Sequence, residues 1–287
     1  MVDYSIWALE CSHLPDYPDS ALIYGATQGA RMLPFCYWIL QGEGHIALID
    51  TGFNDDEFCQ GMIDAYGILG FSRPEKILAR IGVRPEDVDT IIITHHHWDH
   101  ISGLQYFPNA NVYIQRREVD NWMAKWGTPT RQRWLAHGLD PETAADLARI
   151  GGEGRLRLVD GVADVLPGVQ VHPAFDTHTA GSQYIVVQAG DGGDPWVFTG
   201  DAAYTYDNIG GPDGDGPMVP IGLGQGNQEC CVRIADEMLT TAGNNIGRVI
   251  PSHEVRIWDR FPSKVYDDGL HVAELALAPN TPSRIGR

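Results

Sequence analysis

Short apolar runs separated by turn residues dominate the first half of the chain and predict β-strands. Residues 4–9 form one such run, and residues 35–40 and 45–50 form two more on either side of Gly42-Glu43-Gly44. Two runs joined by a short glycine-containing turn are typical of a β-hairpin. Residues 88–94 hold three successive isoleucines, which is typical of a strand that is buried on both faces.

Helices are predicted where a polar capping residue precedes apolar positions at helical spacing. Asn54 or Asp55 is expected to cap a helix that runs to about Tyr66, and Ser72 with Glu75 forms a capping-box pattern for a second helix. Each half of the chain runs from strands to helices, so we expect a single α/β domain over residues 1–287, with helices outside two facing sheets. The same criteria place further helices at 116–126, 141–150 and 229–240, and further strands at 111–114, 155–159, 169–175, 183–188, 196–199 and 248–250.

Three segments are candidate walls of a binding site. Residues 209–226 are rich in glycine and proline, and a loop of this length in a compact domain is usually functional, so we expect it to border the site. Residues 15–32 are a second candidate. The apolar side chains of Trp122, Met123 and Trp126 can line an entrance, but their helical spacing favours a place in the core.

The charge balance restricts the class of partner. The 287 residues carry a formal net charge of −18, which repels polyanions, so nucleic acid is excluded as a partner and a neutral small molecule is favoured. Five irregularly spaced cysteines indicate free thiols in a reducing cytosol. Neither a signal peptide nor a membrane-spanning stretch is evident, so we expect a cytoplasmic protein without a membrane partner.

The sharpest motif follows the buried strand. His95, His97, Asp99 and His100 form the pattern HxHxDH, and strand ends in layered α/β folds present side chains to a ligand crevice. Alternate residues of an extended segment point the same way, so His95 and His97 can meet one metal ion. After the turn, Asp99 and His100 can face a second ion. Imidazole and carboxylate ligands of this kind suit zinc.

Three later residues complete two predicted zinc sites. His178, Asp201 and His253 each follow a predicted strand. We expect His178 to join His95 and His97 at the first ion, and His253 to join Asp99 and His100 at the second. Asp201 would bridge the two ions together with a water or hydroxide.

This ligand order resembles that of the metallo-β-lactamase superfamily. The resemblance extends from Asp50-Thr51-Gly52 to His253 and implies an αββα sandwich that holds two Zn²⁺ ions. The chain departs from the family pattern at Thr177, where glycine is usual, and at Ala180, where proline is usual. Both changes alter the shape of a loop and leave the ligand types intact.

The branch of the superfamily follows from Asp201 and its neighbours. The β-lactamases are disfavoured because they generally lack a bridging aspartate, and the diiron relatives because they usually carry Glu at the position of His97. Glyoxalase II is disfavoured because the short segment after Arg260 lacks its basic helical region. Asp201-Ala202-Ala203-Tyr204 resembles the motif of N-acyl homoserine lactonases, in which the tyrosine reaches the substrate carbonyl. The 4-pyridoxolactonases are a close alternative. Relatives are often monomers or homodimers, which leaves the oligomeric state open.

The predicted activity is hydrolysis of a lactone, a quorum-quenching reaction if the lactone is an N-acyl homoserine lactone. A metal-bridging hydroxide attacks the carbonyl, Tyr204 stabilises the oxyanion and Asp99 carries a proton to the leaving oxygen. Asp50 is expected either to orient a ligand imidazole or simply to cap the turn that follows its strand. Hydrolysis of another ester, a thioester or a cyclic amide is the alternative, and a metal-binding protein without turnover is a third reading.

The remaining histidines are given no role in this scheme. His96 points away from its neighbours in an extended segment and is expected to be structural. The others lack companions at ligand spacing and are expected on the surface or in the core; they are His13, His45, His137, His172 and His271.

Overall fold

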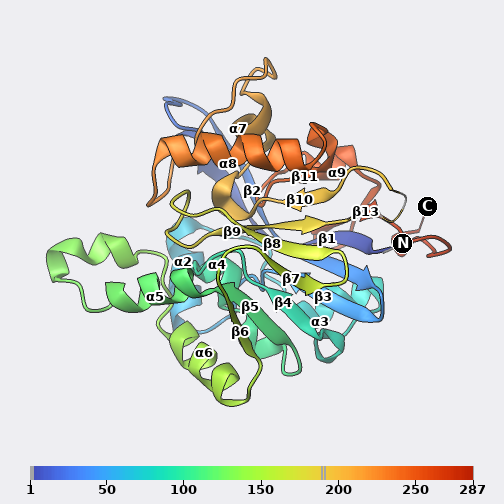
Figure 1. Cartoon of the computed structure of the whole chain (residues 1–287), viewed down its shortest axis with the longest axis horizontal. Helices are drawn as coiled ribbons and strands as arrows, with labels where there is room; N and C mark the ends of the chain where they lie inside the picture. Colours follow the sequence, from blue (N-terminus) through green and yellow to red (C-terminus); the bar gives the residue numbers. More distant parts are fainter. Residues whose placement is uncertain (1–2, 189, 191, 287) are drawn as a thin grey trace.

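Two β-sheets pack face to face at the centre of the computed structural model, and helices cover the outer face of each sheet (Figure 1). The structure describes residues 3–188, 190 and 192–286. The first sheet has the order β12-β13-β1-β2-β3-β4-β5-β6 and the second has the order β11-β10-β9-β8-β7. This arrangement is the predicted four-layer α/β sandwich.

The first sheet comes mainly from the N-terminal half of the chain. Its hairpin of β2 and β3 turns at Glu43 and Gly44, both in the left-handed region with φ of 52° and 82°, as predicted from the glycine-rich turn. From β3 to β6 the strands are parallel, so their carboxyl ends share one edge of the sheet. The strands are β1 (Ser5–Pro18), β2 (Ala30–Gly42), β3 (His45–Ile49), β4 (Thr90–Ile92), β5 (Asn111–Gln115), β6 (Leu156–Val159), β12 (Ser263–Val265) and β13 (His271–Ala276).

The second sheet is smaller and comes from the C-terminal half. Its strands are β7 (Ala163–Leu166), β8 (Val169–Pro173), β9 (Gln183–Val187), β10 (Trp196–Phe198) and β11 (Val249–Ile250). The two sheets are joined where the Gln183 backbone N–H donates to the carbonyl of Thr94, just after β4, at 2.9 Å. This bond lies beside the histidine motif and links the loop after β4 to the start of β9.

The helices form the outer layers of the sandwich. They are α1 (Asp19–Leu22), α2 (Glu57–Tyr66), α3 (Pro74–Leu78), α4 (Trp98–Ile101), α5 (Arg116–Lys125), α6 (Glu142–Gly152), α7 (Tyr206–Gly210), α8 (Gln228–Thr241) and α9 (Ile257–Arg260). A segment after α5 contains the 3₁₀ helix η4 (Thr130–Ala136) and projects from the body of the molecule, in green at the left of Figure 1. The other 3₁₀ helices are η1 (Ala79–Ile81), η2 (Pro85–Asp87), η3 (Leu104–Tyr106), η5 (Gly200–Ala202) and η6 (Ile246–Arg248).

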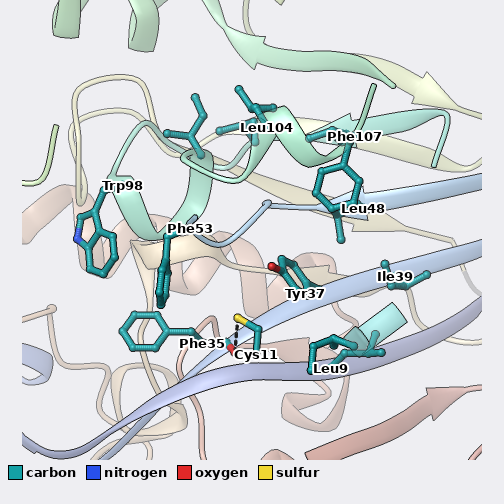
Figure 2. Close-up of a cluster of buried hydrophobic side chains, with 14 of the residues drawn as sticks. Leu9, Cys11, Phe35, Tyr37, Ile39, Leu48, Phe53, Trp98, Leu104 and Phe107 are labelled. Atoms are coloured by element: carbon teal, nitrogen blue, oxygen red, sulfur yellow. Dashed lines mark hydrogen bonds between the residues drawn. The ribbon is translucent and has the colours of Figure 1, made fainter. Parts of the chain in front are cut away.

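Alternation along the central strands explains the layers. In β2, Phe35 and Tyr37 pack into one core cluster, whereas Trp38 and Leu40 pack into another on the opposite face. Figure 2 shows part of the first cluster, in which Phe35, Phe53 and Trp98 lie against one another between β2 and α4. The second cluster lies between the two sheets, and a third lies under α8.

Several sequence predictions about helix ends were wrong. Asp56 caps α2 by accepting from the Cys59 N–H at 2.8 Å, while Asn54 instead accepts from the Asp56 N–H. The predicted capping box at Ser72 does not form, because Pro74 starts α3 and Arg73 takes the cap position without a side-chain bond. The strands β7, β12 and β13 and the helices α1, α4, α7 and α9 were not predicted.

Two expectations from composition can be compared with the structure. All five cysteines carry free thiols, and burial raises the pKa of Cys11 to about 12. Within the described residues, none of the helices combines the length and the apolar character that a membrane crossing requires.

Candidate dinuclear metal centre

The seven predicted ligands come from loops at one edge of the sandwich. His95 and His97 follow β4, and Asp99 and His100 lie in the short helix α4. The second sheet supplies the remaining residues at the ends of its strands: His178 between β8 and β9, Asp201 in η5 after β10, and His253 after β11. Strand ends from both sheets therefore meet at one place, as the sequence predicted.

One group of side chains contains three histidines and one carboxylate. The His97 Nδ1 atom lies 3.0 Å from His95 Nε2 and 2.6 Å from His178 Nε2. Asp201 Oδ2 lies 3.7 Å from His95 Nε2 and 3.4 Å from His178 Nε2. Four lone-pair atoms thus face one another at the spacing of ligands around a single cation.

A second group shares Asp201 with the first. Asp201 Oδ1 lies 3.3 Å from both His100 Nε2 and His253 Nε2. Asp99 Oδ2 lies 3.5 Å from His100 Nε2 and 3.8 Å from His253 Nε2. The two oxygens of Asp201 therefore point to different groups, so this carboxylate would contact both ions if each group held one.

The opposite ring nitrogens fix the tautomers of these histidines. His178 Nδ1 donates to the Leu223 carbonyl at 3.1 Å, and His253 Nδ1 donates to the Pro34 carbonyl at 2.9 Å. These bonds leave each Nε2 lone pair free for a cation. His100 Nε2 is buried and has no hydrogen-bond partner among the described residues. An orphaned buried nitrogen that faces two carboxylates fits a metal ligand well.

Asp50 lies directly behind His100. It ends β3 with a left-handed φ of 57°, and its Oδ2 accepts from His100 Nδ1 at 2.7 Å and from Thr94 Oγ1 at 2.8 Å. Its Oδ1 accepts from the Thr94 N–H at 2.7 Å. The Thr94 hydroxyl in turn accepts from His95 Nδ1 at 3.0 Å. Asp50 thus holds an imidazole of each group, directly or through Thr94.

Burial and nearby charges set the protonation of the site. Burial lowers the pKa of His95, His97 and His178, so these rings are neutral, as ligands must be. Burial also acts to lower the pKa of His100 and His253, but the carboxylate of Asp201 and its neighbours outweigh it and raise both values. A cation that enters the second group therefore competes with protons for these two rings.

A cavity of about 770 Å³, part of it open to solvent, ends at the two groups. Its polar floor holds Asp99, Asp201 and His253, and its remaining lining is largely apolar. The walls come from β1 and β2, from α2, from η4 and from the loop before α8; they include Leu14, Tyr17, Leu33, Phe35, Met62, Tyr66, Ile68, Trp134 and Leu223. The predicted loop of residues 209–226 does border this cavity, through Leu223, Gly224 and Gln225.

Tyr204 also lines the cavity, and its side chain is buried. Its hydroxyl lies 3.2 Å from the Leu223 carbonyl and 3.2 Å from His178 Nδ1. The hydroxyl thus lies on the side of the His178 ring that faces away from the first group. Burial, followed by the charge of Asp201, raises the pKa of Tyr204 well above its ordinary value, so the hydroxyl is a hydrogen-bond donor.

Residues 31–253 match the family model of the metallo-beta-lactamase superfamily. The matched stretch is more than half of the chain and contains all seven of the residues that converge here. The chain belongs to the metallo-β-lactamase superfamily. The resemblance that the sequence motifs indicated is confirmed, together with the αββα fold.

Within this superfamily, the chain is similar to curated lactonases. It is 28% identical over 184 residues to an N-acyl homoserine lactonase of a Bacillus species, a match that covers 61% of this chain and 66% of the relative. The chain therefore spans just under two thirds of the length of the relatives it matches.

Solved structures of other proteins share the fold. A probable metal-dependent hydrolase from Staphylococcus aureus aligns with a TM-score of 0.71 at 19% identity, over 98% of this chain and 99% of the other. AidC, a dizinc quorum-quenching lactonase solved in complex with a product, aligns with a TM-score of 0.62 at 17% identity, over 94% of this chain and 96% of the other.

The structure also places the side chains around this site. His137 is exposed, as expected for a surface histidine, and it lines the cavity with its Nε2 3.0 Å from the Tyr66 hydroxyl. Trp122 is fully buried, as expected of a core residue, whereas Met123 and Trp126 are exposed. No sequence signal identified His137, because it follows η4 and has no nearby ligand-type residue at metal spacing.

Proposed function

We propose that this chain is a dinuclear zinc hydrolase that opens a lactone ring, in an N-acyl homoserine lactone or a related small lactone. The observation that carries the proposal is the carboxylate of Asp201, whose two oxygens face two separate groups of imidazole and carboxylate ligands. The similarity to N-acyl homoserine lactonases supports this choice of substrate.

The donor set suits zinc in both positions. His95, His97 and His178 would hold one ion, Asp99, His100 and His253 would hold the other, and Asp201 would contact both. Histidine nitrogens with carboxylate oxygens are typical zinc ligands. When bound, a pair of zinc ions lowers the pKa of coordinated water and polarises the ester carbonyl.

The side chains of the protein supply orientation and proton transfer. Asp99 lines the cavity and directs Oδ2 toward His100 and His253, which leaves Oδ1 to carry a proton to the ring oxygen as the ester bond breaks. The Tyr204 hydroxyl exchanges its bond to the Leu223 carbonyl for one to the substrate carbonyl. Asp50 holds His100 in the required tautomer.

The apolar walls favour a substrate with an apolar substituent. The cavity floor is polar, while Leu33, Phe35 and Met62 contribute apolar surface to its lining. A lactone ring at the floor would place an acyl chain or an aromatic ring against these walls. A bicyclic lactone of the type opened by 4-pyridoxolactonases is the alternative substrate, and rates measured with both kinds of lactone decide between them.

A panel of substrates tests the proposal. With two equivalents of zinc, we expect base uptake in a pH-stat assay with N-acyl homoserine lactones, and much weaker rates with thioesters and cyclic amides. Preferential turnover of a thioester or another ester would favour the alternative hydrolase. Metal-loaded protein that leaves every lactone, thioester and lactam intact would indicate a binding protein without turnover.

Trp134 provides a test of the apolar wall. It lines the cavity although 58% of its surface is exposed, so we expect Trp134→Ala to raise KM for long-chain lactones roughly tenfold through lost apolar contact. Short-chain lactones should be hydrolysed at the unchanged rate. Trp126→Ala is the matched control, because Trp126, at the C-terminal end of α5, is also exposed but does not line the cavity. Equal effects of both variants on all chain lengths would argue against this wall.

A further inference from the structure

A fully buried carboxylate lies directly behind the histidines of the first group. Glu118 belongs to α5 and has 0% of its surface exposed. Its two oxygens accept four hydrogen bonds, two at each atom. All four donors are neutral groups of the protein. A buried charge of this kind is costly unless its partners are fixed in place, so the surrounding loops must hold a defined geometry.

The two oxygens of Glu118 bind different ligand loops. Oε1 accepts from the backbone N–H of His96, between His95 and His97, at 2.9 Å. Oε2 accepts from the Thr179 hydroxyl at 2.9 Å and from the Gly181 N–H at 2.7 Å, in the loop that carries His178. One carboxylate therefore connects the loop of the first sheet to the loop of the second.

Trp122 gives a further connection to the same group. Its Nε1 donates to Glu118 Oε1 at 2.7 Å, and its ring lies edge-on to the His97 ring with centroids 5.2 Å apart. Glu118 thus fixes the tryptophan that packs against His97. His97 is also the ligand whose Nδ1 lies between the other two imidazoles of the group.

The loop of His178 approaches α5 so closely that only glycine fits at one position. A Cβ atom on Gly181 would lie 2.3 Å from the Glu118 backbone nitrogen and 2.5 Å from its Cα. Such distances are far inside van der Waals contact, so any side chain there would separate the loop from the helix. Glycine at this position therefore allows the short hydrogen bonds between Glu118 and this loop.

We propose that Glu118 is a positioning residue that sets the spacing of His95, His97 and His178. Its role rests on the proposed two-metal function, since the three imidazoles matter as ligands of one ion. Glutamine at this position keeps one acceptor oxygen but turns an NH₂ group toward two donors. The NH₂ group repels the donors of one of the two ligand loops. That loop moves away, and the spacing of the three imidazoles in the first group increases. The second group, held by Asp50 and the Pro34 carbonyl, is left intact.

Metal titration of Glu118→Gln tests this role. Zinc affinity is measured by competition with a chromophoric chelator, and occupancy of each group by the spectrum of the Co²⁺-substituted protein. We expect one ion to bind as in the wild type and the other to bind about 10- to 100-fold more weakly. Excess Zn²⁺ should restore much of the lactone hydrolysis. A protein that is merely unstable should instead bind both ions more weakly.

Two further variants keep the test decisive. Glu10→Gln is the matched control, because Glu10 is also 0% exposed and accepts from the His271 N–H at 2.9 Å, but its side chain contacts His13 and His271, which lie outside the ligand loops. It should bind both ions normally. Thr179→Val removes one donor at similar volume and should give a smaller loss at the same ion, even if Glu118→Gln fails to fold.

The outcomes separate this role from the proposed function. If the wild type binds two ions and Glu118→Gln binds both with unchanged affinity, Glu118 does not position the ligands. Equal weakening of both ions would likewise overturn the assignment to the first group. If the wild type itself binds no more than one ion, the two-metal function fails before Glu118 is tested.

Discussion

Replacement of Asp201 with asparagine should reduce kcat/KM for lactone hydrolysis by roughly 10³-fold or more, because several kcal/mol of metal-derived stabilisation depend on it. The carboxylate is the side chain shared by both ligand groups, at 3.3 to 3.7 Å from four imidazole nitrogens. Asparagine offers one acceptor oxygen, so an N–H₂ group would face one of the groups. Bound metal should fall from two equivalents toward one.

Metal content and steady-state rates measured on the same preparation check this prediction. Asp207→Asn is the control, since Asp207 is buried and paired with Arg31 and Arg256 but is not in either ligand group. This control should lose thermal stability while keeping both metal ions. Full activity with two equivalents of metal in Asp201→Asn would remove the bridging role from the proposal.

Replacement of Tyr204 with phenylalanine should lower kcat for lactones roughly 100-fold, the effect of about 3 kcal/mol from one lost oxyanion donor. The buried ring lines the cavity, so phenylalanine should keep the packing and remove only the hydroxyl. KM should change little, because the bond is expected to strengthen as negative charge develops on the carbonyl oxygen. Turnover of lactones and metal affinity are measured together.

The position of the Tyr204 hydroxyl also allows a second role for this residue, and the same measurements distinguish the two roles. The hydroxyl lies beside His178 Nδ1 and the Leu223 carbonyl, so it can also brace a metal ligand. Loss of kcat with normal zinc affinity supports the direct contact with substrate. Loss of zinc affinity, with kcat restored by excess metal, would instead make Tyr204 a support for His178.

The metal-binding motif could be predicted from sequence because its physics is local. His95 and His97 are alternate residues of an extended segment, and Asp99 and His100 follow within one turn of helix. Local backbone geometry alone therefore keeps these four side chains close together. The distant residues His178, Asp201 and His253 were found because each follows an apolar strand. The strands themselves were evident where both faces are buried, as in β4 and β9.

Features that depend on contacts between distant segments could not be predicted. β12 and β13 complete the edge of the first sheet beside β1, far from it in sequence, and β12 is exposed throughout. Glu118 resembles any polar residue of an amphipathic helix until the loop of Gly181 is placed against it. Ser72 lost its predicted capping role because Pro74 fixes where α3 begins.

The projection that holds η4 has a consequence for how this molecule can change over evolution. It contributes Trp134 and His137 to the cavity, yet the predicted ligands lie in the loops at the strand ends of the two sheets. A mutation in the projection can therefore reshape what the enzyme accepts while the chemistry at the floor stays the same. New substrates can be acquired by altering a peripheral segment whose helix η4 has no buried residue, which makes this segment the natural target for redesign.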